Sequence, residues 1–281
     1  SGTTRPFPRP ATAIAMQKEP EQPASSAPAG VTATAPGTWP GTDPLEAAKT
    51  IRGELGEPHL PFLVELPARG VGADSVGRTA AMLVDLPVDL QPHGWRLVDR
   101  PGIDSRRADS LLSRDINTLA DVIGVEEAPG SRLKVSLQGP LSLAAGLHLH
   151  NGERALSDAG ARRELTESLA AGAAEYVSRV QAVARGAALT VQVDEPLLHR
   201  ILDGRIPTAS GYRTLRSVPP QEASQSWHLL RESLLAAGAA AVVLNLPSAR
   251  HRQSRSGLDL ALGAGADGVA VPLGRLGDGD W

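Results

Sequence analysis

Two adjacent acidic residues, Asp194 and Glu195, follow a strand-like run and stand directly before Pro196. The run Val191–Val193 predicts a strand, and the proline predicts its end, because proline cannot donate to a sheet ladder. Successive strand residues face opposite ways, so we expect one acid to point inward and the other toward a helical layer. An inward carboxylate at a strand end suits a substrate ammonium group or a proton transfer. The alternative is that the acids compensate the charge of a helix N-terminus.

A third acid, Glu65, lies inside the apolar run Leu63–Leu66. Carboxylates are rarely buried without a partner. We therefore expect Glu65 either to contact a ligand or to form an internal ion pair with a neighbour such as Arg69.

The segment Pro36–Thr42 contains two glycines and two threonines beside a predicted strand end. Glycine lets backbone amides come close to a ligand, and the Thr38 hydroxyl could add a hydrogen bond. Gly37 and Thr38 are thus predicted ligand contacts, and a turn punctuated by Gly and Pro is the alternative.

Short β-type runs alternate with longer Ala- and Leu-rich amphipathic stretches from Val31 onward, a pattern typical of βα units around a parallel sheet. The predicted strands are Val31–Thr38, Leu60–Leu66, Asp89–Val98, Leu133–Gln138, Leu189–Val193, Ala240–Leu246 and Gly268–Val271. The predicted helices are Pro44–Leu55, Asp74–Leu83, Ser105–Ile123, Ser157–Arg185, Pro220–Ala237 and Ser256–Leu262.

This alternation predicts an α/β fold of the (β/α)8 TIM-barrel type. Seven strands are recognisable and the eighth is missing, which we interpret as a C-terminal truncation. A barrel domain would span residues 31–281, and a single barrel of this type typically occupies about 250 residues. Residues 1–30 are rich in Pro, Ala, Ser and Thr and are expected to be a disordered arm.

Composition excludes several classes of function. The formal net charge is −3 with both signs dispersed, so we expect no nucleic-acid partner. No apolar run is long enough to span a membrane, and no secretory signal is evident, so the expected location is the cytoplasm. The sequence contains 0 cysteines, which excludes disulfides, thiol nucleophiles and thiolate zinc sites.

The strand-end segments, in their order along the chain, resemble the cobalamin-independent methionine synthase family, particularly its short actinobacterial-type members. The resemblance rests on the segments Thr32–Thr42, Leu63–Gly77, Asp85–Gly102, Lys134–Leu143 and Val191–Pro196. Members of the family have a (β/α)8 barrel shared with uroporphyrinogen decarboxylase. They transfer a methyl group from methyl-tetrahydrofolate to homocysteine, whose sulfur a zinc ion holds as a thiolate.

The resemblance implies a role for each of several residues. Groups near Gly37 and Thr38 would contact the amino-acid carboxylate, and Glu65 and Asp194 would hold the amino group, with Asp194 as the catalytic candidate. On the folate side, the residues implied to lie near the pterin are Trp39, His93 and Trp95.

The zinc ligands of the family are not present in this sequence. The His-x-Cys pair expected after the sixth strand is replaced by Asn245 and Pro247, and Pro272 stands where an acidic ligand would follow the seventh. We therefore predict no cofactor for this chain. Zinc is what makes the homocysteine sulfur a nucleophile at neutral pH, so negligible methyl transfer is expected.

Three functions follow from this resemblance. The first is a working methionine synthase with a divergent C-terminal segment. The second is a zinc-free protein that binds an amino acid or folate, or serves as a scaffold. The third is a uroporphyrinogen decarboxylase-like enzyme, which the lack of an evident Arg-rich N-terminal motif disfavours.

Overall fold

The computed structural model describes residues 32–126, 130–246 and 257–270. The chain divides into two units, Ser1–Val31 and Thr32–Trp281, and every described residue belongs to the second. The arm predicted for residues 1–30 lies outside the described residues.

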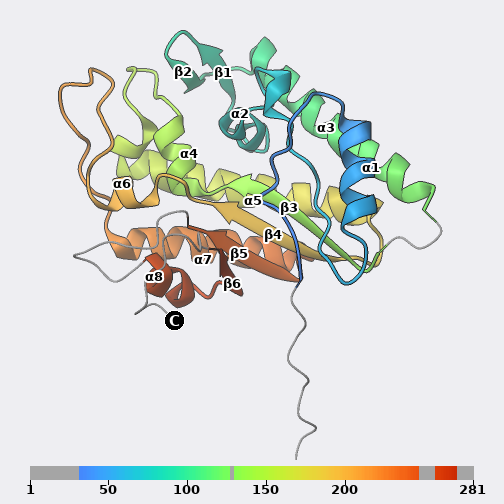
Figure 1. Ribbon diagram of the computed structural model, residues 1–281. Coiled ribbons are helices and arrows are strands. Elements are labelled where there is room, and N and C mark those ends of the chain that lie inside the picture. Colours follow the sequence, from blue (N-terminus) through green and yellow to red (C-terminus); the bar gives the residue numbers. More distant parts are fainter. Residues whose placement is uncertain (1–31, 127–129, 247–256, 271–281) are drawn as a thin grey trace, which may run out of the picture. The chain divides into compact units, whose positions relative to one another are not determined.

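Helices and strands alternate along most of the described chain (Figure 1). The helices are α1 (Pro44–Glu54), α2 (Ser75–Ala80), α3 (Ile103–Gly124), α4 (Pro140–Gly146), α5 (Ala159–Val183), α6 (Leu198–Leu202), α7 (Pro220–Ala236) and α8 (Gly257–Gly263), with 3-10 turns at Pro67–Arg69 and Ala155–Ser157. The strands are β1 (Val88–Gln91), β2 (Gly94–Leu97), β3 (Arg132–Gln138), β4 (Ala188–Asp194), β5 (Ala241–Asn245) and β6 (Gly268–Ala270).

Aspartates begin three of the helices. Asp43 accepts hydrogen bonds from the amides of Leu45 and Glu46 before α1, and Pro44 occupies a first-turn position that needs no N–H. Asp74 and Asp158 cap α2 and α5 in the same way. These local signals explain why the helix starts follow the sequence closely.

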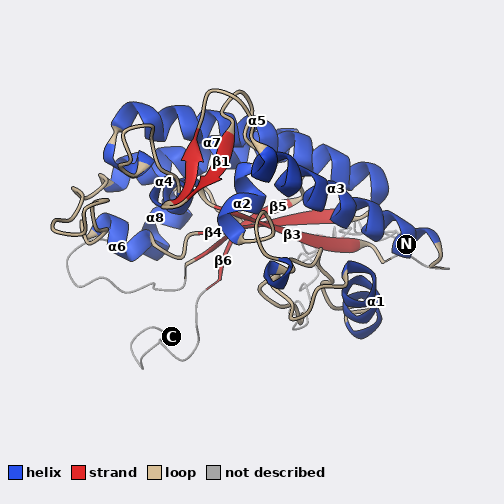
Figure 2. Cartoon of the chain, turned by 90° about the horizontal axis from the view of Figure 1, so that it is seen from above, coloured by secondary structure: helices blue, strands red, loops and turns tan. Residues whose placement is uncertain are grey.

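The main sheet is parallel, in the order β3-β4-β5-β6. On one face, alternate residues of β3 and β4 such as Val135 and Val191 are fully buried, and each contributes about 1.5–3 kcal/mol through burial. Helices α3, α5 and α7 lie together on one side of this sheet (Figure 2). The opposite face carries polar side chains, and we call it the polar face: Lys134, Ser136, Gln138, Gln192, Asp194 and Asn245.

The predicted TIM barrel is wrong. The described residues form six strands, four in a parallel sheet and two in an antiparallel hairpin, instead of seven barrel strands. The predicted strand Asp89–Val98 is in fact the β1–β2 hairpin, with Gln91 paired to Gly94. Its residues pair with each other, so they supply no parallel strand to the sheet.

The first two predicted strands, Val31–Thr38 and Leu60–Leu66, are reduced to isolated parallel bridges. Thr38 pairs with Glu65, and Phe62 pairs with Lys134. A closed barrel requires every strand to pair along its length with both neighbours. Single bridges do not provide that continuous pairing.

Candidate functional site

Strand register brings polar residues together at the carboxyl ends of the parallel strands. Gln138 is paired with Asp194, and Asp194 is paired with Asn245. Paired residues on neighbouring parallel strands share a face of the sheet, so side chains distant in sequence lie next to one another. This is the edge at which open α/β sheets bind ligands.

Among the described residues, Asp194 is anchored through one of its two oxygens. Its Oδ1 accepts hydrogen bonds from Gln192 Nε2 at 2.8 Å and Asn245 Nδ2 at 2.6 Å. No described residue donates a hydrogen bond to Oδ2. Burial raises the pKa of Asp194, while the bonds from Asn245 and Gln192 and the charge of Lys134 lower it. The side chain is therefore oriented but keeps one oxygen available.

The segment that contains Gly37 runs across the polar face. Gln192 Nε2 and Ser136 Oγ both donate to the carbonyl of Pro36, and Lys134 Nζ donates to that of Ala35. Gly37 has φ +129°, and a Cβ there would lie 3.0 Å from Ser136 Oγ. Glycine at position 37 is thus required by both backbone conformation and close packing.

Glu65 lies next to this segment. The amide of Glu65 donates to the carbonyl of Gly37, and the amide of Trp39 donates to the carbonyl of Glu65. The side chain is buried, with 8% of the residue exposed, and no described residue donates a hydrogen bond to its carboxylate. Burial raises the pKa of Glu65 to about 7, against the opposing charge of Arg78. Glu65 therefore changes its charge near neutral pH.

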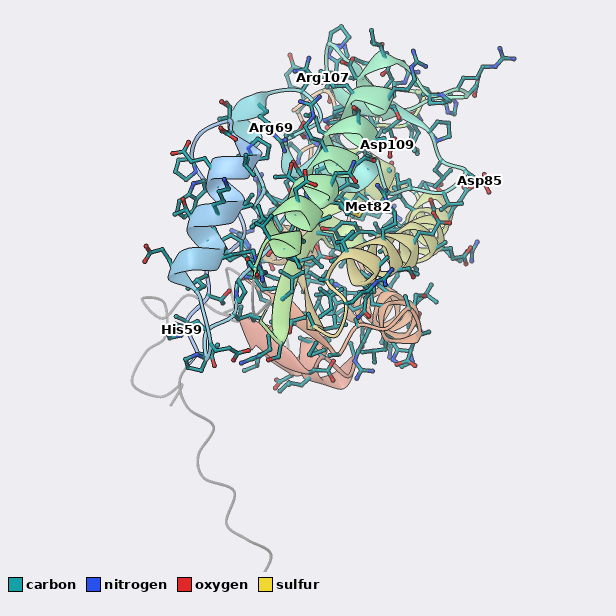
Figure 3. All side chains as sticks on the ribbon, turned by 90° about the vertical axis from the view of Figure 1, so that its right-hand side faces the viewer. His59, Arg69, Met82, Asp85, Arg107 and Asp109 are labelled. Carbon is teal, nitrogen blue, oxygen red and sulfur yellow. The ribbon has the colours of Figure 1, made fainter. Side chains whose placement is uncertain are left out.

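Glu65 does not pair with Arg69, the partner considered from the sequence. Both terminal nitrogens of Arg69 instead bind the carboxylate of Asp115 at 2.8 Å. Arg69 lies beside α3, the helix that carries Asp115 (Figure 3). Glu65 instead forms the internal ion pair with Arg78, whose Nε is 3.7 Å from Oε1.

Lys134 is the second cation of the site. Its Nζ donates to Gln192 Oε1 at 2.7 Å and stands 5.4 Å from the centre of the Phe62 ring. Burial lowers the pKa of Lys134 to about 8, against the charges of Asp194 and Glu65. Lys134 therefore links the two carboxylates electrostatically.

Glu195 points away from the polar face. It is fully buried and accepts hydrogen bonds from the amides of Leu141 and Ser142 and from Trp227 Nε1, at 2.8–3.1 Å. Burial raises its pKa, while these donors oppose the rise. Glu195 thus joins the start of α4 to α7. Because successive strand residues face opposite ways, Glu195 must face the helices when Asp194 lies on the polar face.

The structure separates the three residues implied for the folate side. Trp39 is partly buried and packs against a small hydrophobic cluster that includes residues of α1. Trp95 belongs to the main core and donates its indole N–H to Asp74. His93 is exposed in the turn between β1 and β2. No shared pocket of these three is evident among the described residues. Thr38 is exposed beside Glu65, with its hydroxyl available.

The residues present do not fit the zinc site of the resembled family. Asn245 uses its amide nitrogen to bind Asp194, and an amide is a poor substitute for the imidazole or thiolate that zinc prefers. Among the described residues, no group of three or more His, Cys, Asp or Glu could hold a metal ion. Pro247 and Pro272 lie outside the described residues.

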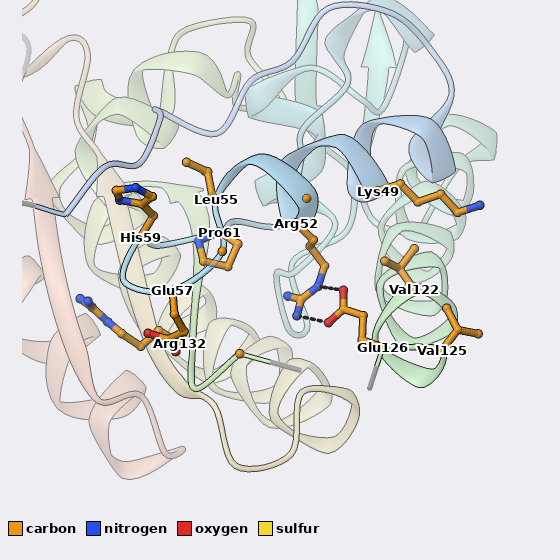
Figure 4. Close-up of a pocket in the computed structure, with 13 residues that line it drawn as sticks. Lys49, Arg52, Leu55, Glu57, His59, Pro61, Val122, Val125, Glu126 and Arg132 are labelled. Atoms are coloured by element: carbon orange, nitrogen blue, oxygen red, sulfur yellow. Dashed lines mark hydrogen bonds and ion pairs between the residues drawn. The ribbon is translucent and has the colours of Figure 1, made fainter. Parts of the chain in front are cut away.

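A separate hollow of about 380 Å³ lies near the start of β3, at the opposite end from Gln138 (Figure 4). Both of its carboxylates already have partners. Glu126 binds Arg52 at 2.5 and 2.6 Å, and Glu57 accepts from the amide and hydroxyl of Ser131. None of the predicted site residues lines it.

Two important residues of the site, Arg78 and Asp115, were missed by the sequence reasoning. Asp115 lies on the apolar face of α3 between Leu112 and Leu119, where a charged residue is unexpected. A buried position for a charge predicts a buried partner. That signal could have identified Asp115, but it does not reveal which arginine pairs with it.

No family model matches this chain, and no curated protein or solved structure matches it either. In the part of the chain that the structure describes, no helix combines the length and apolar character needed to cross a membrane.

Proposed function

We propose that the carboxylates of Glu65 and Asp194 bind the ammonium group of an amino acid of the homocysteine class. The observation that carries this proposal is the set of free acceptor positions at the strand ends. The carboxylate of Glu65 and Oδ2 of Asp194 accept no hydrogen bond from the described residues, and Glu65 is buried while Asp194 is half-buried. Carboxylates shielded in this way are costly unless a ligand or water supplies the donors.

An ammonium group suits these acceptors because it carries three N–H donors and a positive charge. The ligand's own carboxylate would lie toward Gly37 and Thr38, where backbone amides and a hydroxyl are close to Glu65. This orientation follows the family resemblance.

The resemblance extends the proposal to methyl transfer from methyl-tetrahydrofolate to homocysteine. In that reaction, this chain's residues would hold the amino acid and fix its direction. The described residues offer no imidazole or thiolate to activate the sulfur at this edge of the sheet. We therefore expect binding of the amino acid with little or no methyl transfer, the zinc-free alternative.

Titration calorimetry with homocysteine and methionine tests the binding. We expect Glu65→Gln and Asp194→Asn each to weaken it about 10- to 100-fold, because each removes a charged hydrogen bond worth about 1.5–3 kcal/mol. Asp109→Asn makes the same chemical change at an exposed position of α3 and serves as the matched control. Equal affinity in all four proteins, or no heat with either ligand, would contradict the proposal.

A second assay separates binding from catalysis. Homocysteine and methyl-tetrahydrofolate are incubated with the full chain, with and without added zinc, and methionine is measured. We expect no methionine above the protein-free control. Methionine formed by the wild type but not by Asp194→Asn would show that the chain is a working methyltransferase.

A further inference from the structure

Arg78 enters the interior of the molecule from α2. The residue is 4% exposed, and its Nη1 donates to Asp115 Oδ2 at 2.6 Å. Among the described residues, its Nε has no hydrogen-bond acceptor, and this atom stands 3.7 Å from Glu65 Oε1. A buried guanidinium nitrogen without a hydrogen-bond acceptor is unusual, and the charged group that it faces is the carboxylate of Glu65.

Asp115 fixes the direction of Arg78. It accepts two hydrogen bonds from Arg69 and one from Arg78, so both of its oxygens are engaged. Two arginines on one aspartate leave one positive charge in excess. An ionised Glu65 balances that charge, whereas a protonated Glu65 leaves it uncompensated in a buried region.

The turn that follows α2 packs closely against α5. The carbonyl of Met82 approaches α5 so closely that a Cβ at Gly172 would lie 1.5 Å from it. Tyr176, one turn further along α5, lies within the electrostatic reach of Arg78. The backbone that follows Arg78 is therefore held in place, while the hydrogen bond to Asp115 holds its side chain.

We propose that Arg78, held by Asp115, is the positioning residue that favours the ionised form of Glu65 and directs it toward an ammonium ligand. This inference rests on the proposed function and gives the same site its dependence on pH. Arg78 itself does not touch the ligand. It acts through Glu65.

Every element packed around Glu65 contributes to its proton affinity. The charged or titratable groups that face it are Arg78 from α2, Asp115 from α3, Lys134 from β3, Tyr176 from α5 and Asp194 from β4. Burial raises the pKa of Glu65, Arg78 and Lys134 lower it, and Asp194 and Asp115 raise it further. Arg78 has the largest of the charge effects, so its removal should dominate.

A ligand-free measurement tests the role of Arg78 directly. Carbon-13 NMR of the glutamate carboxyl groups is recorded between pH 4 and 9 for the full chain, with Glu65→Gln to assign the signal. We expect a wild-type midpoint near 7, and Arg78→Gln should raise it by about one pH unit or more. Arg78→Lys retains the positive charge and should return the midpoint most of the way.

A second readout needs no change at Arg78, in case Arg78→Gln does not fold. The Nε–H signal of Arg78 in the wild type should titrate with the same midpoint as Glu65, and that titration should vanish in Glu65→Gln. An Nε–H signal that does not respond to pH between 5 and 9 would overturn the proposal. So would a folded Arg78→Gln protein with an unshifted Glu65 midpoint.

Calorimetry over the same pH range then separates this inference from the proposed function. Wild-type affinity for homocysteine should rise with pH through about 7, and Arg78→Gln should move that rise to higher pH. A purely structural role would weaken binding equally at every pH. If the NMR shifts are observed but no ligand binds, the electrostatic role of Arg78 stands and the proposed function fails.

Discussion

Asp194 and Glu195 are neighbours in the sequence, yet they lie on opposite faces of the sheet in opposite surroundings. Glu195 is fully buried and engaged by three N–H donors from two helices. Asp194 shares one oxygen between Gln192 and Asn245, and its other oxygen receives no hydrogen bond from the described residues. Both have a raised pKa because of burial, so burial alone does not distinguish a ligand-binding acid from a structural one.

The number of hydrogen-bond donors makes the distinction. The helix-facing Glu195 has donors from the fold on both carboxylate oxygens, whereas among the described residues Asp194 has donors on one oxygen and Glu65 on neither. Glu65 and Asp115 repeat the contrast around Arg78, because Asp115 accepts three hydrogen bonds from arginines and the carboxylate of Glu65 accepts none from the described residues. A buried acid that lacks donors is therefore the better candidate for ligand binding in this chain.

The largest effect on the free energy of unfolding should come from replacing Glu195, the structural acid. Glu195→Ala leaves two backbone amides and the Trp227 indole N–H without an acceptor, and we expect a loss of about 3–5 kcal/mol in the free energy of unfolding. Asp194→Ala, one residue away, should cost clearly less. Urea denaturation of both variants measures the difference. Equal losses would remove the contrast between the two acids.

Replacing Glu65 is expected to have an intermediate effect on the free energy of unfolding, and of opposite sign, because it should stabilise the protein. Its folded-state pKa of about 7 lies above the ordinary 4.5, so the folded chain holds this proton more tightly than the unfolded chain does. That stability is fully present below about pH 4.5 and is lost as the pH rises through about 7.

Glu65→Gln removes this titration, so we expect it to stabilise the protein by about 1–3 kcal/mol at pH 8. The gain should be smaller at pH 5. Thermal or urea unfolding at both pH values gives the comparison, with Asp109→Asn as the exposed control. A destabilisation that is larger at pH 8 than at pH 5 would show that the folded chain stabilises Glu65 as an anion and would contradict its raised pKa.

The smallest effect is expected at His93, which the family resemblance placed near the folate. This side chain is exposed in the β1–β2 turn. We expect His93→Ala to change stability by no more than about 0.5 kcal/mol and to leave homocysteine affinity unchanged. A marked loss of methyl-tetrahydrofolate binding in calorimetry would instead restore His93 to the site.

Much of the second half of the fold follows from local sequence. The runs at 133–138, 189–193, 240–246 and 268–271 were predicted as parallel strands, and β3 to β6 confirm them within the described residues. Their β-branched and apolar alternation and the intervening amphipathic helices are strong local signals. The capping aspartates likewise act within a few residues of the helices they begin.

The first half was predicted less well, partly because a local turn signal was overlooked and partly because pairing there is non-local. The run Asp89–Val98 contains Pro92 and Gly94, residues typical of turns, and it folds back on itself there into the β1–β2 hairpin. Leu60–Leu66 has the composition of a buried strand and forms only isolated bridges. A pattern of residue types specifies an extended segment, whereas tertiary packing decides what that segment pairs with.

For the site, the sequence by itself determined that acids stand at strand ends and that Asp194 and Glu195 must face opposite ways. Only the tertiary structure decided which of them faces the polar side, and that Glu65 faces Arg78 instead of Arg69. Asp115 lies 37 residues from Arg78 and 46 from Arg69. Residue order sets the direction of each side chain within its own strand or helix, but buried charges find their partners through contacts that sequence spacing does not encode.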